Sequence, residues 1–141
     1  MLMMRSIIRR AGLGTALATL VACGGSDAGT GVRASVTGTY QLATVNSQPL
    51  PFTEQTSGAV VKVTDGTLVA RSDGTFSETL GRSTTSGAGT VLSSTTATGT
   101  YQVGNQVLVF TYSGTGESLL GSLVNGGVLI QNGANSFEYK R

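Results

Sequence analysis

Pairs of Gly with Asp or Asn recur along the chain and separate short runs of apolar and β-branched residues. Such pairs favour tight hairpins of type I′, because Gly, Asn and Asp tolerate the positive φ angles that the central residues of this turn need. Successive hairpins give an antiparallel meander, and a meander of about eight strands can close on itself and leave no open edge. The turn sequences are Asp65-Gly66, Asp73-Gly74, Gly104-Asn105, Asn125-Gly126-Gly127 and Asn132-Gly133.

The runs between these turns alternate apolar and polar side chains, as expected of strands with one buried face. No stretch of helical length in residues 38–141 carries apolar side chains at helical spacing. We therefore predict an all-β domain, a single antiparallel up-and-down meander closed into a small barrel of about eight strands. The expected strands are 38–45, 58–64, 67–72, 75–81, 96–103, 106–112, 116–124, 127–131 and 136–141.

One face of each expected strand is apolar and defines the expected core. In the run around Leu108 and Phe110 the other face is apolar too, with Val107 and Val109, so that strand is either ambiguous or covered on both sides. The positions expected inside are Tyr40, Leu42, Val61, Val63, Leu68, Ala70, Phe76, Leu80, Tyr101, Val103, Leu108, Phe110, Leu119, Leu123, Leu129, Phe137 and Tyr139.

The composition excludes several classes of function. The chain has no His and a single Cys, which removes Ser-His and Cys-His triads, most metal sites and any intrachain disulfide, so we expect no metal and no cofactor. Nine basic residues face seven acidic ones, but three of the arginines lie in the first ten residues. Without that segment six basic residues face seven acidic ones, and no basic stripe remains to bind nucleic acid.

The first 22 residues have the layout of a secretory signal peptide. Arg5, Arg9 and Arg10 give a positive start without acidic residues, and residues 11–21 form an uncharged, mostly apolar run that ends in small side chains. This run is too short to cross about 30 Å of hydrocarbon as a helix. We expect residues 1–22 to be removed on export.

The end of this segment, Leu20-Val21-Ala22-Cys23, resembles the lipobox of bacterial lipoproteins. The resemblance implies that the Cys23 thiol receives a diacylglyceryl group, that the preceding peptide is cut, and that the new amino terminus is acylated, for example with palmitate. Long acyl chains hold a protein on a bilayer, at roughly 0.8 kcal/mol for each buried CH₂. Gly24 at the next position implies the outer membrane of the cell envelope. Residues 23–37 then form the lipidated Cys and a flexible tether, rich in Gly and poor in large side chains.

Residues 38–141 are similar to the small lipocalin-like domains of bacterial lipoproteins. The resemblance implies a small β-barrel and an apolar ligand, and it brings no catalytic residue. It is carried by the short segments 38–42 (GTYQL), 45–51 (VNSQPLP), 73–76 (DGTF), 99–105 (GTYQVGN) and 137–141 (FEYKR).

The predicted function is therefore that of a membrane-anchored, non-enzymatic binding module for a small apolar ligand. The alternative is a structural lipoprotein with a solid barrel, which contacts a protein or polysaccharide through its surface. An eight-stranded barrel has room for packed side chains or for one small ligand, so the same aromatic residues serve either function. The residues expected to line the ligand site are Tyr40, Phe76, Glu78, Tyr101, Phe110, Phe137 and Tyr139.

Glu78 is the one acidic residue that is out of place in the expected strands, because it shares its strand face with Phe76 and Leu80. It points either inward, as a polar contact for a ligand, or into water at a bulge or the barrel rim. A hydrolase that pairs Glu78 with Glu117 or Glu54 is allowed by residue type alone.

The polar stretch 82–95 is interpreted either as a lid over the barrel mouth or as an extended hairpin or mobile loop.

Overall fold

The computed structural model describes residues 36–56, 58–105 and 107–141. The expected signal peptide, the lipobox with Cys23 and the tether up to residue 35 lie outside the described residues. The described chain forms ten strands: β1 (Gly38–Val45), β2 (Gln48–Pro49), β3 (Phe52–Thr56), β4 (Ala59–Ala70), β5 (Thr75–Ser86), β6 (Gly89–Gly104), β7 (Val107–Tyr112), β8 (Ser118–Val124), β9 (Gly127–Asn132) and β10 (Asn135–Lys140).

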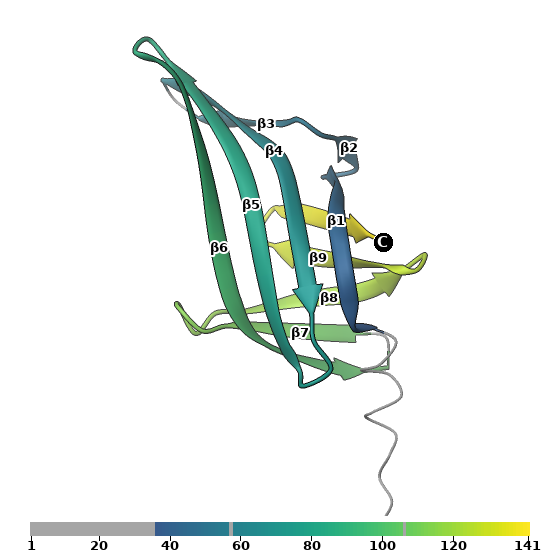
Figure 1. Ribbon diagram of the computed structural model, residues 1–141. Helices are drawn as coiled ribbons and strands as arrows, with labels where there is room; N and C mark the ends of the chain where they lie inside the picture. Colours follow the sequence, from purple (N-terminus) through teal and green to yellow (C-terminus); the bar gives the residue numbers. More distant parts are fainter. Residues whose placement is uncertain (1–35, 57, 106) are drawn as a thin grey trace, which may run out of the picture.

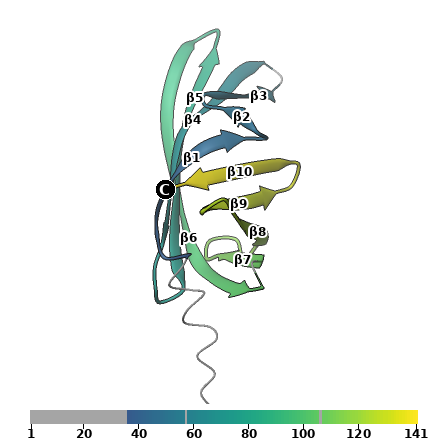
Figure 2. The ribbon, with the colours of Figure 1, turned by 90° about the vertical axis from the view of Figure 1, so that its right-hand side faces the viewer.

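The strands form a closed antiparallel barrel, as the turn sequences predict. From β4 to β10 each strand pairs with the next along the chain, β10 returns to pair with β1, and β1 pairs with β4. Eight strands close the barrel in this way, while β2 and β3 are short additions on β1 and β4. Figures 1 and 2 show β7, β8 and β9 running crosswise to the long strands β4, β5 and β6. The all-β meander is confirmed.

The sheet formed by β3 to β6 extends beyond the barrel at one end (Figure 1). Strand β6 pairs with β5 over residues 89–100 but with β7 only over residues 99–104. We call the extended part of β3, β4, β5 and β6 the flared sheet, and the barrel end beside it the mouth. Residues 82–95 belong to the β5–β6 hairpin of this sheet, so the lid interpretation is wrong and the extended hairpin is correct.

Two of the hairpins have the backbone of a type I′ turn. Asn125 and Gly126 have φ angles of 48° and 78° and lie between paired residues of β8 and β9. Asn46 and Ser47 have φ angles of 52° and 62° and connect β1 to β2. The first of these was expected from its Asn-Gly sequence, whereas the second lacks glycine and gave no such signal.

The turn predicted at Asp65-Gly66 is wrong, because β4 runs unbroken through both residues. A bulge between Val63 and Asp65 takes up the irregularity. Gly66 is buried, and a Cβ there would lie 2.9 Å from the Leu80 side chain and 3.0 Å from that of Leu42. This glycine provides space for neighbouring side chains, and the expected strands 58–64 and 67–72 are one strand.

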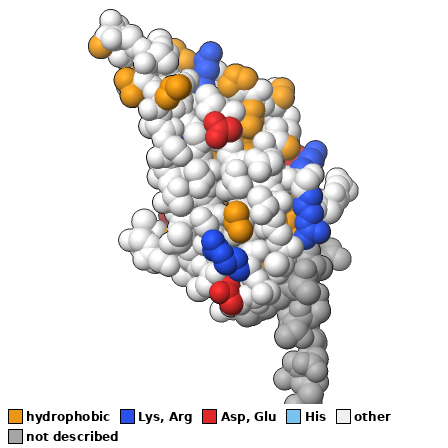
Figure 3. All heavy atoms as spheres, in the orientation of Figure 1, with side chains coloured by type: hydrophobic (Ala, Val, Ile, Leu, Met, Phe, Trp, Pro, Cys, Tyr) orange, Lys and Arg blue, Asp and Glu red, His pale blue; other side chains and the backbone are white. Residues whose placement is uncertain are grey.

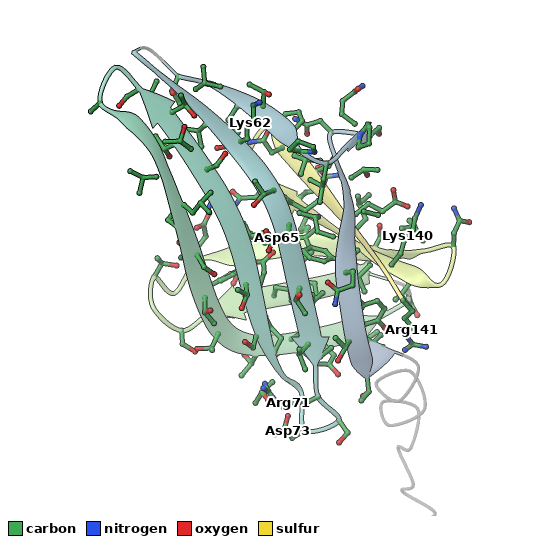
Figure 4. All side chains as sticks on the ribbon, turned by 45° about the horizontal axis from the view of Figure 1, so that its top comes forward. Lys62, Asp65, Arg71, Asp73, Lys140 and Arg141 are labelled. Carbon is green, nitrogen blue, oxygen red and sulfur yellow. The ribbon has the colours of Figure 1, made fainter. Side chains whose placement is uncertain are left out.

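The β4–β5 connection is a hairpin, but its loop is longer than the predicted two residues. Of the pair Asp73-Gly74, only Gly74 has a positive φ, at 84°. The Asp73 carboxylate accepts hydrogen bonds from the backbone N and the Oγ1 of Thr75, at 2.9 and 2.7 Å. These hydrogen bonds lower the pKa of Asp73. Figure 4 places Arg71 and Asp73 at this turn, at the barrel end away from the flared sheet.

The core contains most of the apolar positions that alternation selected. On β9 the expected register is wrong, since Val128 and Ile130 are buried while Leu129 is only partly so. All three side chains are apolar, and pairing with Tyr139 and Phe137 of β10 decides which face is inside. The buried apolar residues are Val36, Tyr40, Leu42, Val45, Val63, Leu68, Ala70, Phe76, Tyr101, Leu108, Phe110, Leu119, Val128, Ile130, Phe137 and Tyr139.

Candidate functional site at the barrel mouth

The middle of the barrel is filled by aromatic side chains. Phe76 and Phe110 meet edge to face with ring centroids 5.1 Å apart, and Tyr101 lies against Phe110 at 6.1 Å. Tyr40 is buried as well, and its hydroxyl donates a hydrogen bond of 2.6 Å to the backbone oxygen of Val36. Packed side chains of the protein itself therefore occupy this part of the barrel interior.

Glu78 points inward from β5 at the mouth side of this aromatic core, with 7% of its surface exposed. The Tyr139 hydroxyl donates a hydrogen bond to Oε1 at 2.5 Å, and the Tyr112 hydroxyl donates one to Oε2 at 2.6 Å. Both carboxylate oxygens therefore have a donor, one from β10 and one from β7. This arrangement satisfies a charged group that would otherwise be costly to bury.

The two tyrosines that hold Glu78 differ in their access to water. Tyr139 is completely buried, while Tyr112 is partly exposed and packs edge to face on Phe76 at 5.0 Å. Burial raises the pKa of both hydroxyls, and the adjacent Glu78 carboxylate raises the pKa further. Both phenols consequently stay protonated and keep donating across the physiological pH range.

A pocket of about 380 Å³ lies at the mouth above Glu78 and Tyr112. It occupies the space where β6 separates from β7, and the β7–β8 loop forms its outer wall. Ala97 and Leu119 supply apolar surface, whereas the remaining side chains are mostly polar. The lining residues are Glu78, Thr96, Ala97, Thr98, Tyr112, Gly114, Thr115, Glu117, Leu119 and Asn132.

The charged groups in this pocket are all acidic. Glu78 and Glu117 line it, and no Lys or Arg is among its lining residues. Glu54, the other carboxylate considered for a two-acid site, lies on the flared sheet within 3.9 Å of Arg82. The pocket therefore favours neutral or positively charged groups over anions.

The predicted ligand residues divide between the pocket and the core. Glu78 points inward and lines the pocket, while Tyr40, Phe76, Tyr101, Phe110, Phe137 and Tyr139 are buried core residues outside the pocket lining. Tyr112 was missed, although it follows Leu108 and Phe110 at a spacing of two, which is the signal for an inward side chain. Whether these residues contact a ligand stays a prediction.

Within residues 36–56, 58–105 and 107–141, no group of three or more acidic, His or Cys side chains is placed to hold a metal ion. The same residues contain no helix with the length and apolar character needed to cross a membrane.

The fold and the mouth pocket define a small eight-stranded antiparallel β-barrel with an acidic pocket at one end. Comparisons with protein families, with curated proteins and with solved structures find no match to this chain.

Proposed function

We propose that this chain is an envelope lipoprotein anchored through Cys23, whose barrel binds a small ligand at its mouth without catalysing a reaction. The pocket of about 380 Å³ beside the Glu78–Tyr112 hydrogen bond is the observation that supports ligand binding. Its volume falls within the range of small-molecule sites, roughly 300–1,000 Å³.

The site proposed is the mouth pocket and not the barrel interior. The packed rings of Phe76, Phe110 and Tyr101 fill the middle of the barrel with the protein's own side chains. The ligand expected from sequence was apolar, but the pocket combines Ala97 and Leu119 with hydroxyl, amide and carboxylate groups. A small amphipathic molecule fits this lining, with a hydroxyl or ammonium group toward the carboxylates and an alkyl part on the apolar side chains.

Binding is favoured over hydrolysis, although Glu78 and Glu117 line the same pocket. A two-carboxylate hydrolase needs one group to donate a proton and the other to act as base or nucleophile. Both oxygens of Glu78 accept hydrogen bonds from Tyr112 and Tyr139, whose own protons are firmly held. Glu78 is therefore suited to hold a polar group in place.

The pocket is tested with three probes that share an alkyl chain, namely n-butylammonium, n-butanol and butyrate. We expect n-butylammonium and n-butanol to shift the NMR amide signals of Thr98, Thr115 and Leu119 in the full-length protein, and butyrate to leave them unchanged. Glu117→Gln should weaken n-butylammonium binding relative to n-butanol, whereas Glu138→Gln, outside the pocket, should not. Equal shifts with butyrate, or shifts elsewhere only, would contradict the proposal.

The anchor is tested separately in the native host. Labelled palmitate should enter the wild-type protein, and Cys23→Ala should both lose the label and leave the membrane fraction. A wild-type protein that takes up no label, or a Cys23→Ala variant that stays membrane-bound, would contradict the proposed lipid anchor. The pocket result would be unaffected, so the two parts can fail independently.

The second candidate is a structural lipoprotein that acts through its surface. The filled aromatic core supports it, because a barrel packed in this way needs no ligand to be complete. Absence of any probe binding at the mouth would favour this candidate.

A further inference from the structure

The side of β6 that faces away from β5 has no strand beside it in the flared sheet. Contact with the next segment of the chain begins only at Thr98, whose C=O accepts a hydrogen bond from the N–H of Ser113 at 2.9 Å. Figure 1 shows this part of β6 at the boundary of the molecule. Among the described residues no strand pairs with residues 89–97 on this side, and we call this segment the β6 edge.

The backbone groups that the β6 edge offers can be assigned from the ladder. Ser86 and Gly89 pair across a two-residue turn, and the ladder with β5 continues without a bulge. Alternate residues of an antiparallel strand point both N–H and C=O away from the partner strand, and Thr98 is one of them. The outward groups before it belong to Thr90, Leu92, Ser94 and Thr96. An extended peptide carries N–H and C=O groups with the same repeat, so it can pair with this row.

The β6 edge ends in the mouth pocket. Thr96 and Thr98 line this pocket, as does Glu117 of the β7–β8 loop, and Glu78 lines it from β5. The hydrogen bond between Thr98 and Ser113 closes the edge at the same point. A peptide strand paired with the edge therefore cannot continue along β6 beyond Thr96, and it has to end or turn away at the pocket.

The charge of the pocket selects the direction in which a peptide lies. In antiparallel pairing the N-terminus of the peptide lies at Thr96, and its ammonium group enters the pocket with Glu78 and Glu117. In parallel pairing a C-terminal carboxylate would face the same two acids, and no Lys or Arg is among the lining residues to offset the repulsion. The pocket therefore favours antiparallel pairing and a free N-terminus.

The other end of the β6 edge carries two exposed apolar side chains. Val91 and Leu92 have 66% and 76% of their surface in contact with solvent. Figure 3 shows hydrophobic side chains at this tip, at the upper left. With peptide residue 1 opposite Thr96, residue 5 lies opposite Leu92 and residue 6 opposite Val91. Apolar side chains at these two peptide positions would cover both.

We infer that the β6 edge and the mouth pocket together bind the free N-terminal end of an extended peptide, antiparallel to β6, with apolar residues at its positions 5 and 6. Peptide residues 1, 3 and 5 pair with Thr96, Ser94 and Leu92, and form about six backbone hydrogen bonds. The inference rests on the proposed function, since the ammonium group occupies the mouth pocket, and it names the class of ligand. It does not depend on the lipid anchor.

The test uses the full-length protein in mild detergent and the hexapeptide amide Ala-Thr-Thr-Thr-Leu-Val, with a free or an acetylated N-terminus. At saturation the free peptide should slow amide hydrogen exchange of Leu92, Ser94 and Thr96 about tenfold or more, because their outward N–H groups become hydrogen-bonded. Ser93 and Thr95, whose N–H groups already bond to β5, should change little. Acetylation removes the charge and should weaken binding roughly tenfold. Ser at peptide positions 5 and 6 should weaken it too.

Two pairs of variants separate the pocket from the edge. Glu117→Gln should reduce the difference in affinity between the free and the acetylated peptide, whereas Glu138→Gln, outside the pocket, should preserve it. Ser94→Pro removes an outward N–H and leaves the β5 ladder intact, so it should weaken peptide binding but not n-butylammonium binding. Ser94→Ala keeps the N–H and should preserve both. Circular dichroism checks that each variant is folded.

Equal affinity for the free and the acetylated peptide would overturn the inference, as would unchanged binding in folded Ser94→Pro. Slow exchange of Leu92, Ser94 and Thr96 in the protein without peptide would overturn it as well, since a second copy or another chain would then cover the edge already. Binding of n-butylammonium without any effect of the peptide would overturn this inference and leave the proposed function standing. Failure of both probes would contradict the proposed function itself.

Discussion

Each oxygen of the Glu78 carboxylate accepts a hydrogen bond from a different tyrosine, so a Tyr→Phe substitution can remove the donor to either oxygen. Tyr139→Phe and Tyr112→Phe each remove a single hydroxyl that donates to Glu78, to Oε1 and Oε2 respectively. Tyr139 is fully buried, whereas Tyr112 lines the mouth pocket. We expect Tyr139→Phe to destabilise the protein substantially more than Tyr112→Phe.

The magnitudes follow from whether water can replace the lost donor. Removing Tyr139 Oη leaves a buried carboxylate oxygen without its hydrogen bond, which costs about 1.5–3 kcal/mol for a charged acceptor. Removing Tyr112 Oη leaves an oxygen beside the pocket, where a water molecule can donate in its place, and the cost falls to roughly 0.5–1 kcal/mol. The two variants should therefore differ by roughly 0.5–2.5 kcal/mol, with Tyr139→Phe the less stable.

The measurement is equilibrium unfolding in urea, followed by circular dichroism and by tyrosine fluorescence, since the chain has no Trp. Both variants should lower the midpoint without changing the slope. Glu78→Gln, alone and combined with each phenylalanine variant, completes two double-mutant cycles. The coupling energy with Glu78 should be larger for Tyr139 than for Tyr112.

Equal destabilisation by the two phenylalanine variants would refute this reasoning, because it depends on their different access to water. A negligible effect of Tyr139→Phe, with no coupling to Glu78, would show that the hydroxyl contributes no net stability.

Two further predictions concern pH and close packing. Burial and Glu78 raise the pKa of Tyr112 and Tyr139, so the unfolded chain loses these protons at lower pH than the folded protein does, and the free energy of unfolding should fall as the pH rises above about 10. Urea unfolding measured from about pH 8 to 11 checks this. Tyr139→Phe should make the free energy of unfolding depend less steeply on pH. Gly99→Ala should cost more than about 2 kcal/mol, since its Cβ would meet the Thr111 backbone oxygen, while Gly114→Ala, with nothing within 4 Å, should have little effect on thermal unfolding.

Local sequence patterns determined the secondary structure and most of the core. Alternating apolar residues fix which side chains can share a face, and turns such as Asn125-Gly126 have backbone angles that few residues tolerate. These signals act over a few residues, so they predicted the meander and the inward position of Phe76, Phe110 and Tyr139 without knowledge of the closed barrel.

The same patterns gave wrong predictions at a glycine and at an apolar run that are each compatible with two structures. Gly66 reads as a turn residue, but in the fold it makes room for the side chains of Leu42 and Leu80. On β9, Leu129 and its neighbours are all apolar, and pairing with β8 and β10 selects the buried face. Both outcomes depend on contacts with other strands, which the pattern within one strand does not contain.

Only the tertiary structure decided the environment of Glu78 and the open edge of β6. Glu78 can be buried because barrel closure brings Tyr112 and Tyr139 to its two oxygens from strands 34 and 61 residues away. Strand β6 is longer than its partner β7, which leaves residues 89–97 without a strand on the side away from β5 and opens the mouth pocket beside them. The periodicity of a strand determines which face of the sheet a side chain points to. Closure of the barrel and the unequal lengths of its strands determine which groups surround that side chain.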